Sequence, residues 1–161
     1  MNTYSVLAGR IRAALNDLER VVRRAEDLLK KAQQLNDDGY LDGVALNLHG
    51  FYAGVERIFE DIARNLDEAV PTGPDWHRDL LLQMSASIDG VRPAVISQET
   101  RFYLDEYRGF RHVVRNVYTF NLRPLRLYEL AGNLSTCYQR LNAELAGFIA
   151  FLGDLDKDVG D

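Results

Sequence analysis

The residues best suited to chemistry lie in one short segment, 111–118, which reads Arg-His-Val-Val-Arg-Asn-Val-Tyr. A helix of ordinary pitch would gather its polar side chains on one arc: Arg111, His112, Arg115, Asn116 and Thr119. Arginine forms bidentate hydrogen bonds with phosphate oxygens, and histidine transfers protons near neutral pH. The spacing therefore predicts a phosphate-binding helix face. Tyr118 lies at its boundary, and Phe110 and the three valines form the buried side.

Neither arginine of this face has an acidic neighbour one turn further on, because those positions hold Arg115 and Thr119. Like charges one turn apart repel each other. We therefore expect an anion from outside the chain to neutralise Arg111 and Arg115. The alternative is an ordinary solvated helix face with surface ion pairs.

The basic character is local, since the whole chain carries a net charge of -5. That charge argues against a protein that coats nucleic acid through a generally basic surface. Residues 101–126 differ, with six arginines and His112 against Asp105 and Glu106. We expect Arg108 and Arg123 to extend the phosphate- or RNA-binding surface around Arg115.

The segment Gly109–Tyr118 resembles the signature helix of HEPN-superfamily proteins of the HepT-like type. In that pattern four residues separate an arginine from a histidine, and one further residue separates the histidine from a tyrosine. Arg111 and Tyr118 match the pattern, whereas Asn116 occupies the histidine position. Other stretches similar to HepT-like sequences are Phe51-Tyr52, Glu56 to Phe59, Trp76 to Arg78 and Leu81-Leu82.

The resemblance implies one HEPN-like helical domain over residues 1–161 that acts as a metal-independent endoribonuclease toxin. It also implies a homodimer that sets two copies of the motif across a shared RNA-binding cleft, and neutralisation by a small minimal nucleotidyltransferase antitoxin. The motif tyrosine of such toxins is a target for adenylylation, which makes Tyr118 the candidate modification site. Phosphate added beside Arg111 would block the cleft and cancel its positive charge.

The departure at Asn116 bears on catalysis. Cleavage through the 2′-hydroxyl needs a proton acceptor and a proton donor that work near neutral pH, and an amide is neither. An asparagine can still orient a phosphate or a base edge. In an active protein the catalytic set would be Arg111, His112, Asn116 and Tyr118, with His112 as the acid or base. The alternatives are an inactive HEPN module that binds nucleotide, RNA or a protein partner, and a plain helical assembly protein.

These residues must be positioned by helices, because apolar side chains recur every three or four residues along most of the chain. We predict helices over 4–35, 42–69, 76–88, from Ser97 or Thr100 through the basic segment, and from Pro124 to 152. The tail 153–161 is expected to fray. No run alternates as a strand would, so the predicted fold is all-α, an antiparallel bundle of about five helices.

Turn-forming residues separate the predicted helices. The first break falls at residues 36–39, Asn-Asp-Asp-Gly, and the second at 71–75, where Asp75 can cap the next helix. Pro124 suits a first helical turn.

The remaining candidates favour structural roles. Cys137 is the single cysteine, expected as a small buried hydrophobe, and the three dispersed histidines predict no metal site. Glu56 and Glu60 are expected on a solvated face and Trp76 as a packing anchor. Tyr103, Tyr107 and Tyr128 can stack on RNA bases, although core packing is favoured.

No phosphate-binding glycine loop or other cofactor motif occurs, and no cofactor is expected. The longest apolar runs are far too short to span a membrane, and no secretory signal precedes the first helix. We therefore expect a cytoplasmic protein.

Overall fold

Long apolar stripes organise the chain into helices in the computed structural model, which describes residues 3–116 and 122–159. The side chains of Arg115, Asn116 and Val159 are outside this description. The helical elements are α1 (Thr3–Leu35), α2 (Gly39–Ile62), a π-helical turn η1 (Ala63–Asp67), α3 (Trp76–Met84), α4 (Gln98–Asn116) and α5 (Pro124–Val159). The all-α helical bundle predicted from the sequence is therefore confirmed.

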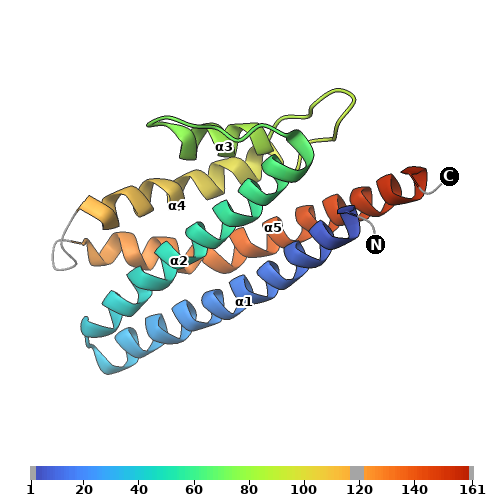
Figure 1. The fold of residues 1–161 in the computed structure, drawn as a ribbon. Helices are drawn as coiled ribbons and strands as arrows, with labels where there is room; N and C mark the ends of the chain where they lie inside the picture. Colours follow the sequence, from blue (N-terminus) through green and yellow to red (C-terminus); the bar gives the residue numbers. More distant parts are fainter. Residues whose placement is uncertain (1–2, 117–121, 160–161) are drawn as a thin grey trace.

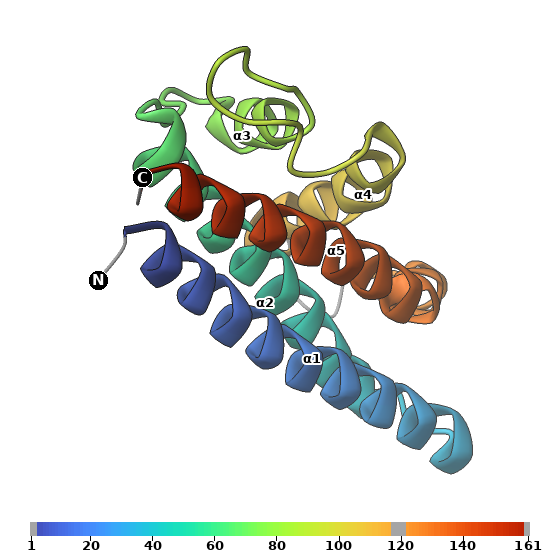
Figure 2. The ribbon, with the colours of Figure 1, turned by 90° about the vertical axis from the view of Figure 1, so that its right-hand side faces the viewer.

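The long helices α1, α2, α4 and α5 form the body of the molecule (Figure 1). α1 and α2 form an antiparallel hairpin, and α5 runs antiparallel to α1, so the N-terminus of α1 lies near the C-terminal end of α5. α4 lies beside α5, and the short α3 lies across the side of the bundle farthest from α1, as the rotated view also shows (Figure 2). The short helix thus faces α2 and α4 rather than α1.

The core forms where the predicted stripes meet. The α1 stripe is buried at Leu7, Ile11, Leu15, Leu18, Val22 and Ala25. The α5 stripe is buried at Leu127, Ala131, Leu134, Leu141, Leu145, Phe148 and Leu152. Cys137 is buried as predicted, and burial raises the pKa of its thiol to about 12. Among the described helices, none combines the length and apolarity needed to cross a membrane.

Two helices end earlier than predicted. The second helix was expected to reach residue 69, but its α-helical part ends at Ile62 and widens into η1, which stops where Glu68 takes a left-handed φ of 56°. The third was expected to reach residue 88 and ends at Met84. There, the Met84 carbonyl accepts hydrogen bonds from the Val95 and Ile96 amides, so the following loop uses the end of the helix.

The last helix is longer than predicted. We expected fraying from residue 153, but α5 continues to Val159. Leu155 packs against the core, and Asp156 accepts a hydrogen bond of 2.6 Å from the Ser5 hydroxyl on α1. Tertiary contacts with the first turn of α1 therefore support this end.

The predicted breaks and caps are mostly correct. Asn36 has a left-handed φ of 49° between α1 and α2, and the Ser97 hydroxyl accepts a hydrogen bond from the Thr100 amide at the start of α4. Pro124 begins α5. Asp75 precedes α3 as predicted, but its carboxylate makes no capping hydrogen bond and instead lies 3.6 Å from the Arg78 guanidinium.

A buried arginine fixes the connection between α3 and α4. Arg92 is fully buried and donates two hydrogen bonds to Asp67, of 2.6 and 2.8 Å. It also donates to the carbonyls of Gln83, Ala86 and Pro93. Because Asp67 ends η1, this pair joins the end of the second helix to the last turn of α3 and to the loop that follows it.

We expect Arg92→Leu to lower the free energy of unfolding by about 3–5 kcal/mol, because it leaves the buried Asp67 carboxylate without its partner. Arg23→Leu, which removes an exposed arginine paired with Glu19 on α1, provides the control and should change stability by less than about 1 kcal/mol. Urea denaturation of both variants measures the difference. Equal stability of the two variants would contradict the role assigned to Arg92.

Candidate functional site

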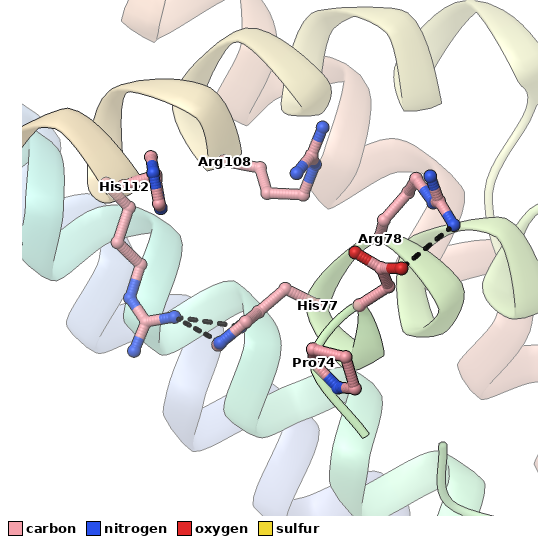
Figure 3. Close-up of a pocket in the computed structure, with 7 residues that line it drawn as sticks. Pro74, His77, Arg78, Arg108 and His112 are labelled. Atoms are coloured by element: carbon pink, nitrogen blue, oxygen red, sulfur yellow. Dashed lines mark hydrogen bonds and ion pairs between the residues drawn. The ribbon is translucent and has the colours of Figure 1, made fainter. Parts of the chain in front are cut away.

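A cavity of about 350 Å³ opens between the start of α3 and the middle of α4. Its walls are formed by Pro74, Asp75, His77, Arg78, Arg108, Arg111 and His112. Figure 3 shows Arg108 and His112 on the α4 side and His77, Arg78 and Pro74 on the α3 side. We call this cavity the α3–α4 cleft. It brings together arginine and histidine side chains from two separate parts of the sequence.

The helical period of α4 explains why its polar residues divide between the interior and the cleft. Leu104 and Tyr107 are buried, and Arg111 follows Tyr107 by one turn, so its side chain begins on the inward side of the helix. Arg108 is one position away and turns toward the cleft, and His112 follows Arg108 by one further turn. Arg111 thus reaches from the cleft toward the interior, whereas Arg108 and His112 face the cleft.

At the inner end of the cleft, three helices contribute one cluster of charged side chains. Glu56 of α2 is 3% exposed, and its Oε1 lies 2.9 Å from Nη1 of Arg111. Its other oxygen, Oε2, lies 2.5 Å from Nδ1 of His77 at the start of α3. Nη1 of Arg111 also lies 2.9 Å from Nδ1 and 3.3 Å from Nε2 of that ring. We call these residues the Glu56–His77–Arg111 cluster.

The contact between Glu56 and His77 determines the form of the imidazole ring. Nδ1 lies 2.5 Å from Oε2 of Glu56 and 2.9 Å from Nη1 of Arg111. An ionised carboxylate can only accept hydrogen bonds, so the shorter contact is a hydrogen bond when Nδ1 carries the hydrogen, and Nη1 of Arg111 then donates to Oε1 of Glu56 rather than to Nδ1. Nδ1 therefore donates to Glu56. In the neutral ring Nε2 then carries the lone pair, which makes it the nitrogen that can accept a proton.

Arg111 is not fully satisfied by this cluster. Its Nε is buried and has no hydrogen-bond partner in the described part of the chain, although Nη1 pairs with Glu56. A buried donor without an acceptor is unfavourable. A phosphate oxygen or a water molecule that reached this nitrogen would remove that penalty.

Two aromatic residues complete the surroundings of the cluster. The Trp76 ring lies against the His77 ring, with 3.6 Å between their centroids and 31° between their planes. Trp76 also packs against the core, as predicted. Tyr52 lies one turn before Glu56 and is fully buried. Burial, and then the charge of Glu56, raise the pKa of its phenol above the ordinary value, so the phenol stays neutral.

The other arginines of the cleft form ion pairs that are more exposed than the pair of Arg111 with Glu56. Arg78 lies 3.6 Å from Asp75 and 3.7 Å from Asp79, and all three side chains are largely exposed. Arg108 lies 2.7 Å from Asp105 on its own helix. Exposed pairs of this kind contribute little and exchange readily with solvent. An incoming anion can therefore replace these carboxylates, unlike the buried Glu56.

Three sequence-based expectations need correction. Arg111 was expected to lack an acidic partner within the chain, but Glu56 supplies one across the helix interface. Glu56 itself was expected on a solvated face and is buried. Val113 was placed on the buried side of the helix and is 42% exposed. Helical spacing alone reveals neither a partner on another helix nor which side of α4 meets α2.

The remaining predicted site residues are only partly gathered here. Arg108, Arg111 and His112 share the α3–α4 cleft, whereas exposed Arg123 lines a separate groove of about 640 Å³ with Arg108. The last two residues of α4 are Arg115 and Asn116, whose side chains the structure does not describe. Tyr118 lies outside the described residues. Tyr107 belongs to the core, where its hydroxyl donates a hydrogen bond of 2.7 Å to the Leu130 carbonyl.

Glu56 and His77 were missed as site residues, although the sequence holds a signal for one of them. Glu56 follows Tyr52 by one turn and precedes Phe59 by three residues, within the apolar stripe of the second helix. A glutamate inside such a stripe requires a buried partner. His77 has no comparable signal, because its position beside Glu56 depends on how α3 packs.

One comparison with known proteins identifies the family of the chain. The family model described as HepT-like protein matches residues 43–152, which is more than half of the chain, so the chain belongs to the HepT-like family. No curated protein and no solved structure matches it significantly.

The cluster makes a testable contribution to stability. Glu56→Leu should lower the free energy of unfolding by about 3–5 kcal/mol, because Arg111 then loses its buried counter-charge. Adding Arg111→Leu should restore part of the loss, with a coupling energy of about 1–3 kcal/mol in a double-mutant cycle. Chemical denaturation of the four proteins measures both values. Additive effects would show that the pair does not interact as described.

Proposed function

We propose that the chain is a HepT-like protein of the toxin type that binds RNA in the α3–α4 cleft and cleaves it without a metal ion. The observation that carries this proposal is the convergence of Arg108, Arg111, His77 and His112 on one cavity. Guanidinium groups suit the phosphodiester, and histidines suit the proton transfers of cleavage through the 2′-hydroxyl.

The charge balance is compatible with RNA binding even though each arginine of the cleft has a carboxylate nearby. The Arg78 pairs are exposed and long, at 3.6 and 3.7 Å, so phosphate oxygens can take the place of Asp75 and Asp79. Arg111 keeps Glu56 but still offers the buried Nε donor. A phosphate would therefore meet exposed donors on Arg78, and a small movement of Arg111 would bring its Nε within reach.

The family supports the wider biological context of the proposal. As a HepT-like toxin, the protein would form a homodimer in which two copies of the motif face a shared cleft. Its antitoxin would be a minimal nucleotidyltransferase that adenylylates Tyr118. The phosphate of an adenylyl group on Tyr118, which follows α4 by two residues in the sequence, would compete with RNA for the arginines of that helix.

RNA cleavage should persist in the presence of a chelator, because the proposed chemistry uses no metal ion. Incubating the chain with a random-sequence RNA oligomer and excess EDTA, and resolving the products on a gel, tests this expectation. Products that end in a 2′,3′-cyclic phosphate are expected. RNA that stays intact at high protein concentration would contradict the enzymatic proposal.

Arg111→Ala should reduce the cleavage rate by about 10²–10³-fold, because it removes a donor from the reacting phosphate. Arg108→Ala should mainly weaken binding and lower the salt dependence of affinity by about one unit of slope. Arg23→Ala, which removes an exposed, paired arginine on α1, is the matched control. Thermal melting of each variant separates a loss of function from a loss of fold. Equal activity in Arg111→Ala and Arg23→Ala would exclude the α3–α4 cleft as the RNA site.

The second candidate function is an inactive HEPN module that binds nucleotide, RNA or a protein partner. The observation that favours it is Asn116 at the motif position of the histidine.

Asn116→His discriminates between the two candidates. From a parent that already cleaves RNA, we expect the added imidazole to raise the rate by no more than about tenfold, because the cleft already contains two histidines. Cleavage rates of parent and variant under the same conditions provide the measurement. An inert parent whose Asn116→His variant cleaves RNA would identify the chain as the binding module.

A further inference from the structure

We propose that His77, positioned by Glu56, is the general base of RNA cleavage in the α3–α4 cleft. The inference rests on the proposed function and assigns its proton transfer to a residue outside the motif helix. Cleavage without a metal requires a group that accepts the proton of the attacking 2′-hydroxyl. The amide of Asn116 cannot accept it, so the acceptor must be another residue.

The structure places His77 where such a group is needed. Its ring lines the cleft, and its side chain is about one-quarter exposed, at 24%, so a substrate can reach it. It enters from the first turn of α3, opposite Arg108 and His112 of α4, as Figure 3 shows. A phosphodiester held by the arginines of α4 would lie beside this ring.

The ring is also held in a defined orientation. Glu56 Oε2 lies 2.5 Å from Nδ1, and the Trp76 ring stacks on the imidazole with centroids 3.6 Å apart. Glu56 is 3% exposed, so the carboxylate cannot turn away to solvent. A buried carboxylate on Nδ1 fixes the tautomer and leaves Nε2 to exchange protons with a substrate, which is the arrangement of carboxylate–histidine pairs in other enzymes.

The charged groups that face His77 come from all three helices of the site. They include Glu56 of α2, the three residues of α4 that line the cleft, which are Arg108, Arg111 and His112, and Asp75 and Arg78 at the start of α3. Nη1 of Arg111 lies 2.9 Å from Nδ1 and 3.3 Å from Nε2, so its contact with Nε2 is the longest of those it makes with His77 and Glu56. A phosphate that binds Arg111 competes with this longer contact and leaves Nε2 available.

The step balances without any cofactor. Nε2 of neutral His77 takes the proton from the 2′-hydroxyl while the 2′-oxygen forms a bond to the adjacent phosphorus. The bond from phosphorus to the 5′-oxygen breaks, and this leaving oxygen takes a proton from water. The products are a 2′,3′-cyclic phosphate and a free 5′-hydroxyl, and His77 then returns its proton to the solvent. Glu56 acts here as a positioning residue.

Two substitutions of His77 separate catalysis from structure. The amide of His77→Asn can still donate a hydrogen bond to Glu56, so a purely structural histidine would tolerate the change. If His77 is the base, the His77→Asn and His77→Ala variants should each cleave RNA about 10²–10⁴-fold more slowly than the wild type. Binding of a 2′-O-methyl RNA oligomer, which cannot be cleaved, should stay within about threefold of the wild type, a change below about 1 kcal/mol. His49→Ala, on α2 outside the cleft, is the histidine control.

Chemical rescue supplies the readout that a structural role would not affect. Free imidazole added to His77→Ala should restore cleavage in proportion to the concentration of its unprotonated form, after subtraction of the protein-free reaction. If His77→Ala does not fold, the His77→Asn rate and its 2′-O-methyl RNA affinity decide the matter alone.

The outcomes separate this inference from the function on which it rests. Intact RNA with the wild-type chain would overturn the proposed cleavage and the base assignment together. Cleavage at the wild-type rate in His77→Asn would overturn only the base assignment. Full activity of His77→Ala, together with rescue of His112→Ala by imidazole, would also overturn it, because His112 would then be the base.

Discussion

A single buried carboxylate constrains the whole site. Glu56 lies inside the apolar stripe of α2, where a lone charge would be strongly unfavourable, and it is stabilised by His77 from α3 and Arg111 from α4. The three helices must therefore meet at one point with their polar atoms in register. The cleft exists because α3, which supplies its other wall, is held against α2 and α4 there.

This constraint is reinforced by a second buried pair further along the chain. Arg92 and Asp67 join the end of η1 to the loop that follows α3. With Glu56 contacting the first turn of α3 and Arg92 bonded to carbonyls at its end, both ends of this nine-residue helix are fixed. A short helix with few core residues thus presents His77 in a stable position.

The fold was largely predictable from the sequence, whereas the site was predictable only in part. Stripes such as Leu7 to Ala25 on α1 and Leu127 to Leu152 on α5 follow from helical period, and glycine, proline and asparagine mark the breaks. Arg108, Arg111 and His112 were identified because all of them lie on one helix. Glu56 and His77 were not, since their role arises from contacts between helices, and the end of α5 was misjudged because Ser5 and Asp156 meet only in the folded chain.

The distribution of the Glu56–His77–Arg111 cluster over three helices has a consequence for classifying related chains. A search for the motif on one helix sees an asparagine in place of a histidine and assigns the chain to the inactive members. A second search could also require an acidic residue within the second helix and a histidine at the start of the third. Such a search would separate this chain from those that lack both residues. On the proposed role of His77, chains whose motif lacks the histidine would divide into those with a substitute group supplied from a neighbouring helix and those without one.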